Sequence, residues 1–168
     1  MERLRRALRG ADRGEKPALP VGEAMHPVAL LAVVLLIVND WVLKPALHDG
    51  SALGELVTGK LSDIAGLAFA PVVLTAAIGL VLAIAAKLGA RVTPYLTQRR
   101  LVLAIAATGI TFAAVKLSPA AAEALANALS HLGRRASIYL DRWDLLTLPA
   151  LAVAYWIGRD ELARLRPA

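Results

Sequence analysis

The sequence predicts an all-α integral membrane protein, a bundle of four transmembrane helices plus a short extra helix between spans three and four. Of its 168 residues 58% are hydrophobic, and charged residues fall to 19%. Average soluble domains carry about half apolar residues and roughly a quarter charged ones. The charges also leave long stretches of the chain free. This combination is typical of a polytopic membrane protein.

Four apolar segments account for the predicted spans. The first covers about Ala24 to Leu43, with Pro27 in its first turn, where a missing N–H is tolerated. The second covers Ser62 to Ala86 and the third covers Leu101 to Leu117. The fourth must extend from about Tyr139 to Gly158. Each is then long enough, or nearly so, to cross a bilayer.

The fourth span is the least regular of the set. Only Leu145 to Gly158 is free of charge, which is shorter than the roughly 20 residues that a hydrocarbon core requires. Either Asp144, together with Asp141, lies below the membrane surface, or this segment does not span. Both alternatives stay open at the level of sequence.

An extra helix is expected between spans three and four. Ser118 can cap it, Pro119 suits its first turn and Gly133 can end it. One face of this helix carries leucines: Leu125, Leu129 and Leu132. We expect it to lie at the interface or to pack on the bundle.

Basic residues predict the orientation and the division of the chain. Residues 1–23 form a basic tail, residues 24–158 the four-helix transmembrane domain and residues 159–168 a second tail. The connection between spans two and three carries four bases and no acid: Lys87, Arg91, Arg99 and Arg100. The positive-inside rule therefore places both termini and this connection in the cytoplasm. The bases cluster at segment ends without interleaved aromatics, which argues against nucleic acid and leaves the lipid bilayer as the first partner.

A layer of polar residues is expected near the outer end of the spans. Counting about 1.5 Å per residue from the cytoplasmic ends brings Asp40, Lys116 and Asp144 to heights of roughly 20–24 Å. Charges at such depth are costly, so they must pair or face water. The candidate cluster contains Asn39, Asp40, Lys44, Lys60, Ser62, Asp63, Lys116, Asp141 and Asp144.

Helix-end electrostatics offers a simple account of most of these charges. Acids are favoured at helix N-termini and bases at C-termini. On this view Asp63 occupies the first turn of span two with Ser62 as its cap, and Lys60 extends to the headgroups. Asp40 lies at the disfavoured end of its helix, so we expect a tertiary partner for it, and Lys116 is the first choice.

Small residues predict close helix packing along span two. Gly66 and Ala70 form a small-xxx-small pair, which lets helix backbones approach one another. Pro71 follows directly and is expected to kink the helix.

The polar layer leaves three functions open, and whether the protein is an enzyme stays undecided. The favoured one is a structural or partner-docking module with a paired charged layer, its partner being another membrane protein or a second copy. The first alternative is a divalent-cation-dependent enzyme acting on a lipid or lipid-linked phosphate, in which carboxylates bind Mg²⁺ or another divalent cation. Its metal ligands would be Asp40, Asp63, Asp141 and Asp144. The second alternative is proton- or cation-coupled transport with Asp40 as the titrating group.

Two sequence blocks carry a resemblance. They are "TGKLSDIAGLAFAP" at 58–71 and "DRWDLLTLPAL" at 141–151. With Asn39-Asp40 before the first loop, they resemble small bacterial multi-pass membrane proteins with a GKLSD-x-AGL block and a later D-x-x-DLL-x-LP block. The resemblance implies the inner (cytoplasmic) membrane of a bacterium and implies no activity.

Overall fold

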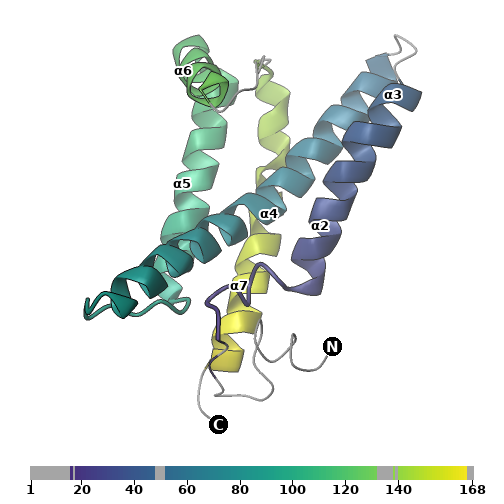
Figure 1. Cartoon of the computed structure of the whole chain (residues 1–168). Helices are drawn as coiled ribbons and strands as arrows, with labels where there is room; N and C mark the ends of the chain where they lie inside the picture. The colour runs from purple at the N-terminus through teal and green to yellow at the C-terminus, as the bar shows by residue number, and fades with distance from the viewer. Residues whose placement is uncertain (1–15, 17, 48–51, 132–137, 139, 166–168) are drawn as a thin grey trace.

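The computed structural model describes residues 16, 18–47, 52–131, 138 and 140–165, and these are helical with short connections (Figure 1). No strand occurs among them. The elements are α2 (Pro27–Val38), η1 (Asn39–Leu43), α3 (Lys44–Ala46), α4 (Ala52–Lys87), α5 (Gln98–Leu117), α6 (Pro119–Ser130), η2 (Arg142–Ala150) and α7 (Leu151–Leu165). The predicted all-helical class is confirmed.

The first rod consists of α2, η1 and α3 in succession. It starts where Val28 N–H donates to His26 Nδ1 at 3.1 Å, with Pro27 in the first turn as predicted. Its continuation η1 is a π-helical turn, which inserts one extra residue per turn and is frequent at functional sites. This turn carries Asn39 and Asp40.

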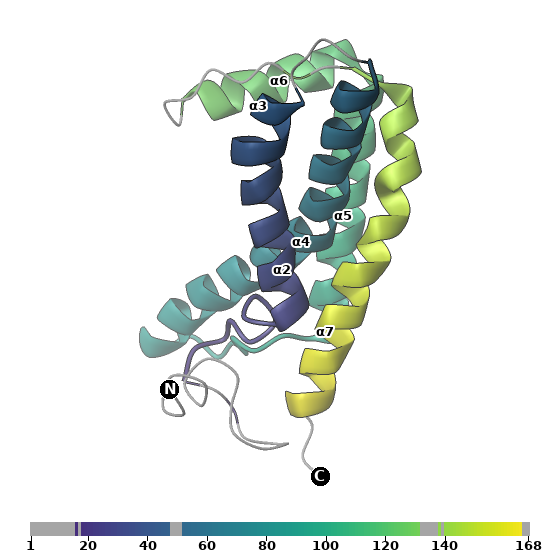
Figure 2. The same cartoon turned by 90° about the vertical axis from the view of Figure 1, so that its right-hand side faces the viewer.

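The longest helix, α4, runs without interruption from Ala52 to Lys87. The prediction that the second helix starts at Ser62 is therefore wrong, because the polar stretch before Ser62 is already helical. Pro71 lies inside the helix, and Figure 2 shows α4 changing direction about midway along its length. A proline in this position removes one backbone hydrogen bond and permits such a bend.

Helix α6 lies across the end of the bundle (Figure 2). Ser118 ends α5 in an extended conformation and then caps α6 by accepting a hydrogen bond from Ala121 N–H at 3.4 Å. The prediction of an extra helix capped by Ser118 is confirmed. The expected end at Gly133, and Leu132 on the predicted apolar face, lie outside the described residues.

The last rod joins η2 to α7 and extends over the height of the bundle (Figures 1 and 2). Three described helical segments are long and apolar enough to cross a membrane, namely Pro27–Ala46, Val57–Lys87 and Gln98–Leu117. The prediction of four apolar spans is thus confirmed for three segments only. The last rod falls short because charges close to both its ends, such as Asp144 and Arg159, leave too short an apolar stretch.

The start of α2, the α4–α5 connection and the end of α7 lie together at one end of the bundle, which we call the inner end (Figure 1). The α3 helix, α6 and the start of η2 lie at the opposite, outer end.

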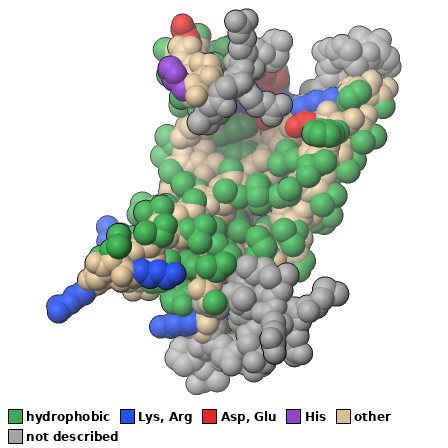
Figure 3. Space-filling model, viewed as in Figure 1, with side chains coloured by type: hydrophobic (Ala, Val, Ile, Leu, Met, Phe, Trp, Pro, Cys, Tyr) green, Lys and Arg blue, Asp and Glu red, His purple; other side chains and the backbone are tan. Residues whose placement is uncertain are grey.

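The side-chain distribution is that of a protein surrounded by lipid. The core is built from small and medium side chains, with Ala29, Val72, Ala154 and Ile157 fully buried. Large apolar side chains instead cover the exposed sides of the bundle (Figure 3). Ile110, for example, is 70% exposed. Such a surface is unusual for a water-soluble monomer and is suited to a bilayer.

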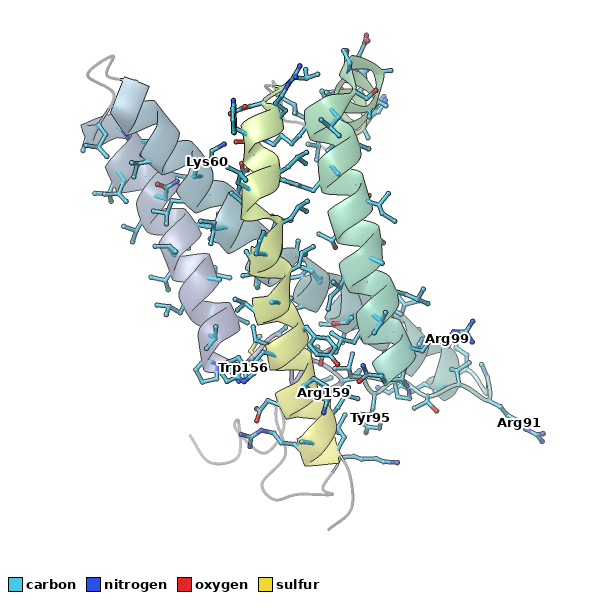
Figure 4. All side chains as sticks on the ribbon, turned by 180° about the vertical axis from the view of Figure 1, so that it is seen from behind. Lys60, Arg91, Tyr95, Arg99, Trp156 and Arg159 are labelled. Atoms are coloured by element: carbon cyan, nitrogen blue, oxygen red, sulfur yellow. The ribbon has the colours of Figure 1, made fainter. Side chains whose placement is uncertain are left out.

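Aromatic side chains mark both ends of the bundle. Trp41 in η1 and Trp143 in η2 are exposed near the outer end, and Tyr155 and Trp156 are exposed on α7. Figure 4 shows Trp156 toward the inner end. Trp and Tyr are enriched where membrane and water meet. These belts were not noticed in the sequence, and they bracket the apolar surface between them.

Candidate functional site

The predicted polar residues gather at the outer end in two groups that share α4. We call the first the five-charge cluster, formed by Lys60, Asp63, Lys116, Asp141 and Asp144. The second, the amide cluster, contains Asn39, Asp40, Lys44, Thr58 and Ser62. All nine residues expected in one polar layer are present, but they do not converge on a single point.

Asp144 is the centre of the five-charge cluster. One of its carboxylate oxygens accepts a hydrogen bond from Lys60 on α4, and the other accepts one from Lys116 on α5. Figure 4 shows Lys60 reaching from α4 toward the rod that contains η2. Asp144 is only 7% exposed, so these bonds are largely shielded from solvent.

Two further aspartates complete the five-charge cluster. Lys60 Nζ lies 3.3 Å from Asp141 Oδ2, and Lys116 Nζ lies 3.5 Å from Asp63 Oδ2. Asp141 also caps η2, because its Oδ1 accepts a hydrogen bond from Trp143 N–H at 2.9 Å. Each lysine therefore bridges two carboxylates, and the cluster ties α4, α5 and η2 together.

The amide cluster is organised by Asn39, which is fully buried. Its Nδ2 donates to the Thr58 carbonyl at 2.8 Å and to Ser62 Oγ at 2.7 Å. Asn39 Oδ1 has no hydrogen-bond partner among the described residues.

The predicted pairing of Asp40 with Lys116 is wrong. Asp40 Oδ1 accepts hydrogen bonds from Lys44 Nζ at 2.6 Å and from Ser62 Oγ at 3.2 Å. The side chain of Asp40 is 48% exposed, so Asp40 lacks the buried partner that was expected. Lys116 on α5 is instead paired with Asp144 of η2 and with Asp63 of α4.

Two helix-end interpretations are also wrong. Ser62 does not cap α4 and Asp63 is not in its first turn, since the helix begins at Ala52. Lys60 does not simply extend to the headgroups, because Asp141 and Asp144 hold it. Tertiary contacts, not helix dipoles, therefore account for these three side chains.

The arrangement does not favour a metal site. The part of the chain that the structure describes contains no group of three His, Asp or Glu side chains placed to hold a metal ion. Asp40 belongs to the amide cluster, while Asp141 and Asp144 belong to the other group. The two oxygens of Asp144 are both engaged by lysines.

Sequence reasoning missed two buried acids at the inner end. Glu23 and Glu161 are each 2% exposed, although both were placed in or beside solvated tails. Burial raises the pKa of the Glu23 carboxyl, and its neighbours Thr75 and Arg100 only partly offset this effect. Helical periodicity offers a signal for Glu161, which falls on the same face as buried Ala154 and Ile157. We find no comparable signal for Glu23.

A groove opens beside the five-charge cluster, between α4 and α5. It has a volume of about 420 Å³, and Ser62 and Asp63 line it together with Gly66, Ala70 and Ala107. We call it the outer groove. Gly66 has nothing within 4 Å of the position that a Cβ would take, so the predicted small-residue face meets no neighbouring helix here.

The candidate site therefore consists of the five-charge cluster and the open, largely apolar outer groove beside it. No family model, curated protein or solved structure matches the chain.

Proposed function

We propose that this chain is a small non-catalytic membrane module, in which the five-charge cluster clamps three helical segments and the outer groove receives a transmembrane helix of a partner protein. One observation carries the proposal. Asp144 is bonded by Lys60 and Lys116 from two different helices, while the small-residue face next to it stays open. The charges thus satisfy one another, and the groove is what remains available to a partner.

The clamp follows from the cost of separating its members. Breaking a buried ion pair by removing one partner costs about 3–5 kcal/mol, because the remaining charge stays desolvated. Here the removal of Asp144 would leave Lys60 with Asp141 alone and Lys116 with Asp63 alone, and it would break the one carboxylate link between these two lysines. Such a connection is well suited to hold the two helices at a fixed separation at the outer end.

The composition of the outer groove favours a helix as its occupant. Gly66, Ala70 and Ala107 are small, and Thr108 and Thr111 add hydroxyl groups along α5. Small residues allow close backbone approach between helices in lipid, and Thr side chains can hydrogen-bond across such interfaces. The volume of about 420 Å³ accommodates several side chains of an approaching helix.

We further propose that η2 and α7 complete a fourth crossing of a bacterial inner membrane, with both chain ends in the cytoplasm. The five-charge cluster supports this topology, because it neutralises Asp141 and Asp144 where the fourth crossing would enter the bilayer. The bases of the α4–α5 connection support the orientation, since positive residues accumulate in cytoplasmic loops.

The two alternatives gain less support. A lipid-phosphate enzyme needs its four aspartates to converge, and Asp40 lies in the other cluster. Transport through Asp40 needs a titrating carboxylate on a polar path, and Asp40 is instead paired with Lys44 on the exposed side of the first rod.

The docking proposal is tested by photo-crosslinking in native membranes. A photoreactive side chain at Thr111 lies in the outer groove, and one at Ile110 faces the exposed surface. We expect a defined protein adduct from position 111 only, and we expect Gly66→Leu to abolish it. Gly59→Leu is the matched control, because Gly59 also has open space around it but does not line the groove.

Four results would contradict the proposal. Equal adducts from positions 110 and 111, or adducts that survive Gly66→Leu, would exclude the groove as the docking surface. An adduct of twice the mass of the chain would assign the groove to a second copy. Mg²⁺-dependent turnover of a lipid phosphate by the purified chain, lost in Asp63→Asn and Asp144→Asn, would establish an enzyme instead.

A further inference from the structure

A second groove lies between α4 and α5 toward the inner end, and the proposed function makes no use of it. Its volume is about 380 Å³, and we call it the inner groove. Apolar residues of both helices line its length, including Leu74, Ile78, Leu103 and Ala107. Arg99 and Arg100 line its other end. Leu74 and Ala107 also line the outer groove, so the two grooves meet there.

We propose that the inner groove binds one anionic phospholipid from the leaflet at the inner end, with an acyl chain between α4 and α5 and the phosphate on Arg99. The inference does not depend on the docking role of the outer groove.

The dimensions of the inner groove fit one leaflet. Arg99 and Ala107 are eight positions apart on α5, which corresponds to about 12 Å at about 1.5 Å per residue. Half of a hydrocarbon core of about 30 Å is about 15 Å. Figure 2 shows the second half of α4 turning away from α5 toward the inner end, and the groove of about 380 Å³ lies between these two helices.

The charge at the inner groove fits a phosphate. Arg99 is exposed, and it makes no hydrogen bond or ion pair with any described residue. Arg100 is held in place by the carbonyls of Pro94 and Thr93, both at 2.8 Å. Arginine presents a planar fork of donors that matches phosphate geometry.

Further basic residues near the inner groove add to its positive charge. Lys87 and Arg91 precede the arginine pair, and residues 87–100 contain no acid. Figure 3 shows these bases as a blue group at the inner end, and Figure 4 shows Arg91 and Arg99 projecting from it. The one acid described next to Arg100 is Glu23, which is buried and does not compete at the groove mouth. An apolar groove that ends in an arginine with no partner among the described residues selects an anionic lipid over a zwitterionic one or a soluble phosphate.

The proposal is tested on the full-length chain in detergent by native mass spectrometry. The chain is titrated with an equimolar mixture of phosphatidylglycerol and phosphatidylcholine that carry the same acyl chains. We expect one phosphatidylglycerol to bind in preference. Arg99→Gln should weaken that binding about fivefold, the effect of one basic contact near a membrane surface. Arg91→Gln is the control, since Arg91 does not line the groove.

A second pair of variants tests the acyl-chain part of the site. Leu103→Trp should fill the inner groove and reduce lipid binding, whereas Val102→Trp should not, because exposed Val102 does not line the groove. Added inorganic phosphate should not displace the lipid. Equal binding of both lipids, equal effects within either pair of variants, or displacement by phosphate alone would overturn the proposal.

Discussion

The outer and inner ends of the bundle use charge in opposite ways. At the outer end, acids and bases from different helices pair with one another, as Asp144 does with Lys60 and Lys116. At the inner end Glu23 and Glu161 are buried and Asp160 pairs with Arg164, while Arg99 is exposed and forms no ion pair with any described residue. In the roles proposed above, the outer charges hold the helices together, whereas the inner bases bind anionic lipid.

The largest effect is expected from Asp144→Leu. This change leaves Lys60 and Lys116 without their shared carboxylate, so the free energy of unfolding should fall by about 3 kcal/mol or more. Thermal unfolding of the chain in detergent measures this loss. In the double variant with Lys116→Met, the loss should be smaller than the sum of the two single losses, because the residues are directly coupled. Additive losses would show that the outer charges do not act as a clamp.

A smaller loss is expected from Asn39→Ala. Asn39 is buried, and its amide donates to the Thr58 carbonyl and to Ser62. Leaving these groups unpaired should lower the free energy of unfolding by about 1–3 kcal/mol. Chemical unfolding in mixed micelles gives the value. Val42→Ala, which changes an exposed apolar residue of the same rod, is the control. If Asn39→Ala lowers the free energy of unfolding by less than Val42→Ala does, the amide cluster does not stabilise the outer end.

The inner end should respond to pH through Glu23. Burial raises the pKa of Glu23 above its ordinary value of 4.5, so the folded state binds its proton more tightly than the unfolded state does. This contribution to stability is complete below about pH 4.5 and is lost as the pH rises through the higher folded value. Melting temperatures across this range should therefore fall with pH in the wild type and fall less in Glu23→Gln. Identical slopes would show that Glu23 is not buried in its protonated form.

The smallest effect is expected from Asp40→Asn. Asp40 and Lys44 are about half exposed and lie four residues apart on one rod, and such pairs contribute roughly 0.2–1 kcal/mol. Membrane yield and melting temperature should therefore change little. A loss as large as that of Lys116→Met would contradict this assignment and restore the single shared layer that the sequence predicted.

The sequence was sufficient to predict which residues form the candidate site, but it was not sufficient to predict which of them pair with one another. Hydropathy and the free-energy cost of charge in lipid identify Lys116 and Asp144 as residues that must pair or face water, whereas Lys60 was expected to extend to the headgroups. The choice of partner depends on helix rotation, which sequence spacing does not define when a π-helical turn lies at Asn39. The same turn helps explain why Asp40 was assigned the wrong partner. Ser62 and Asp63 were misplaced because α4 starts ten residues earlier than the apolar run does.

The sequence by itself determined the helical class, three membrane-length apolar helices and the capping of α6 by Ser118. These features follow from local composition and from hydrogen bonds within a few residues. Only the tertiary structure decided that Asp144 joins two helices, that Gly66 faces an open groove and that Glu23 is buried. Such features depend on how helices are rotated and separated, and that is determined by the packing of the whole bundle and not by any one segment.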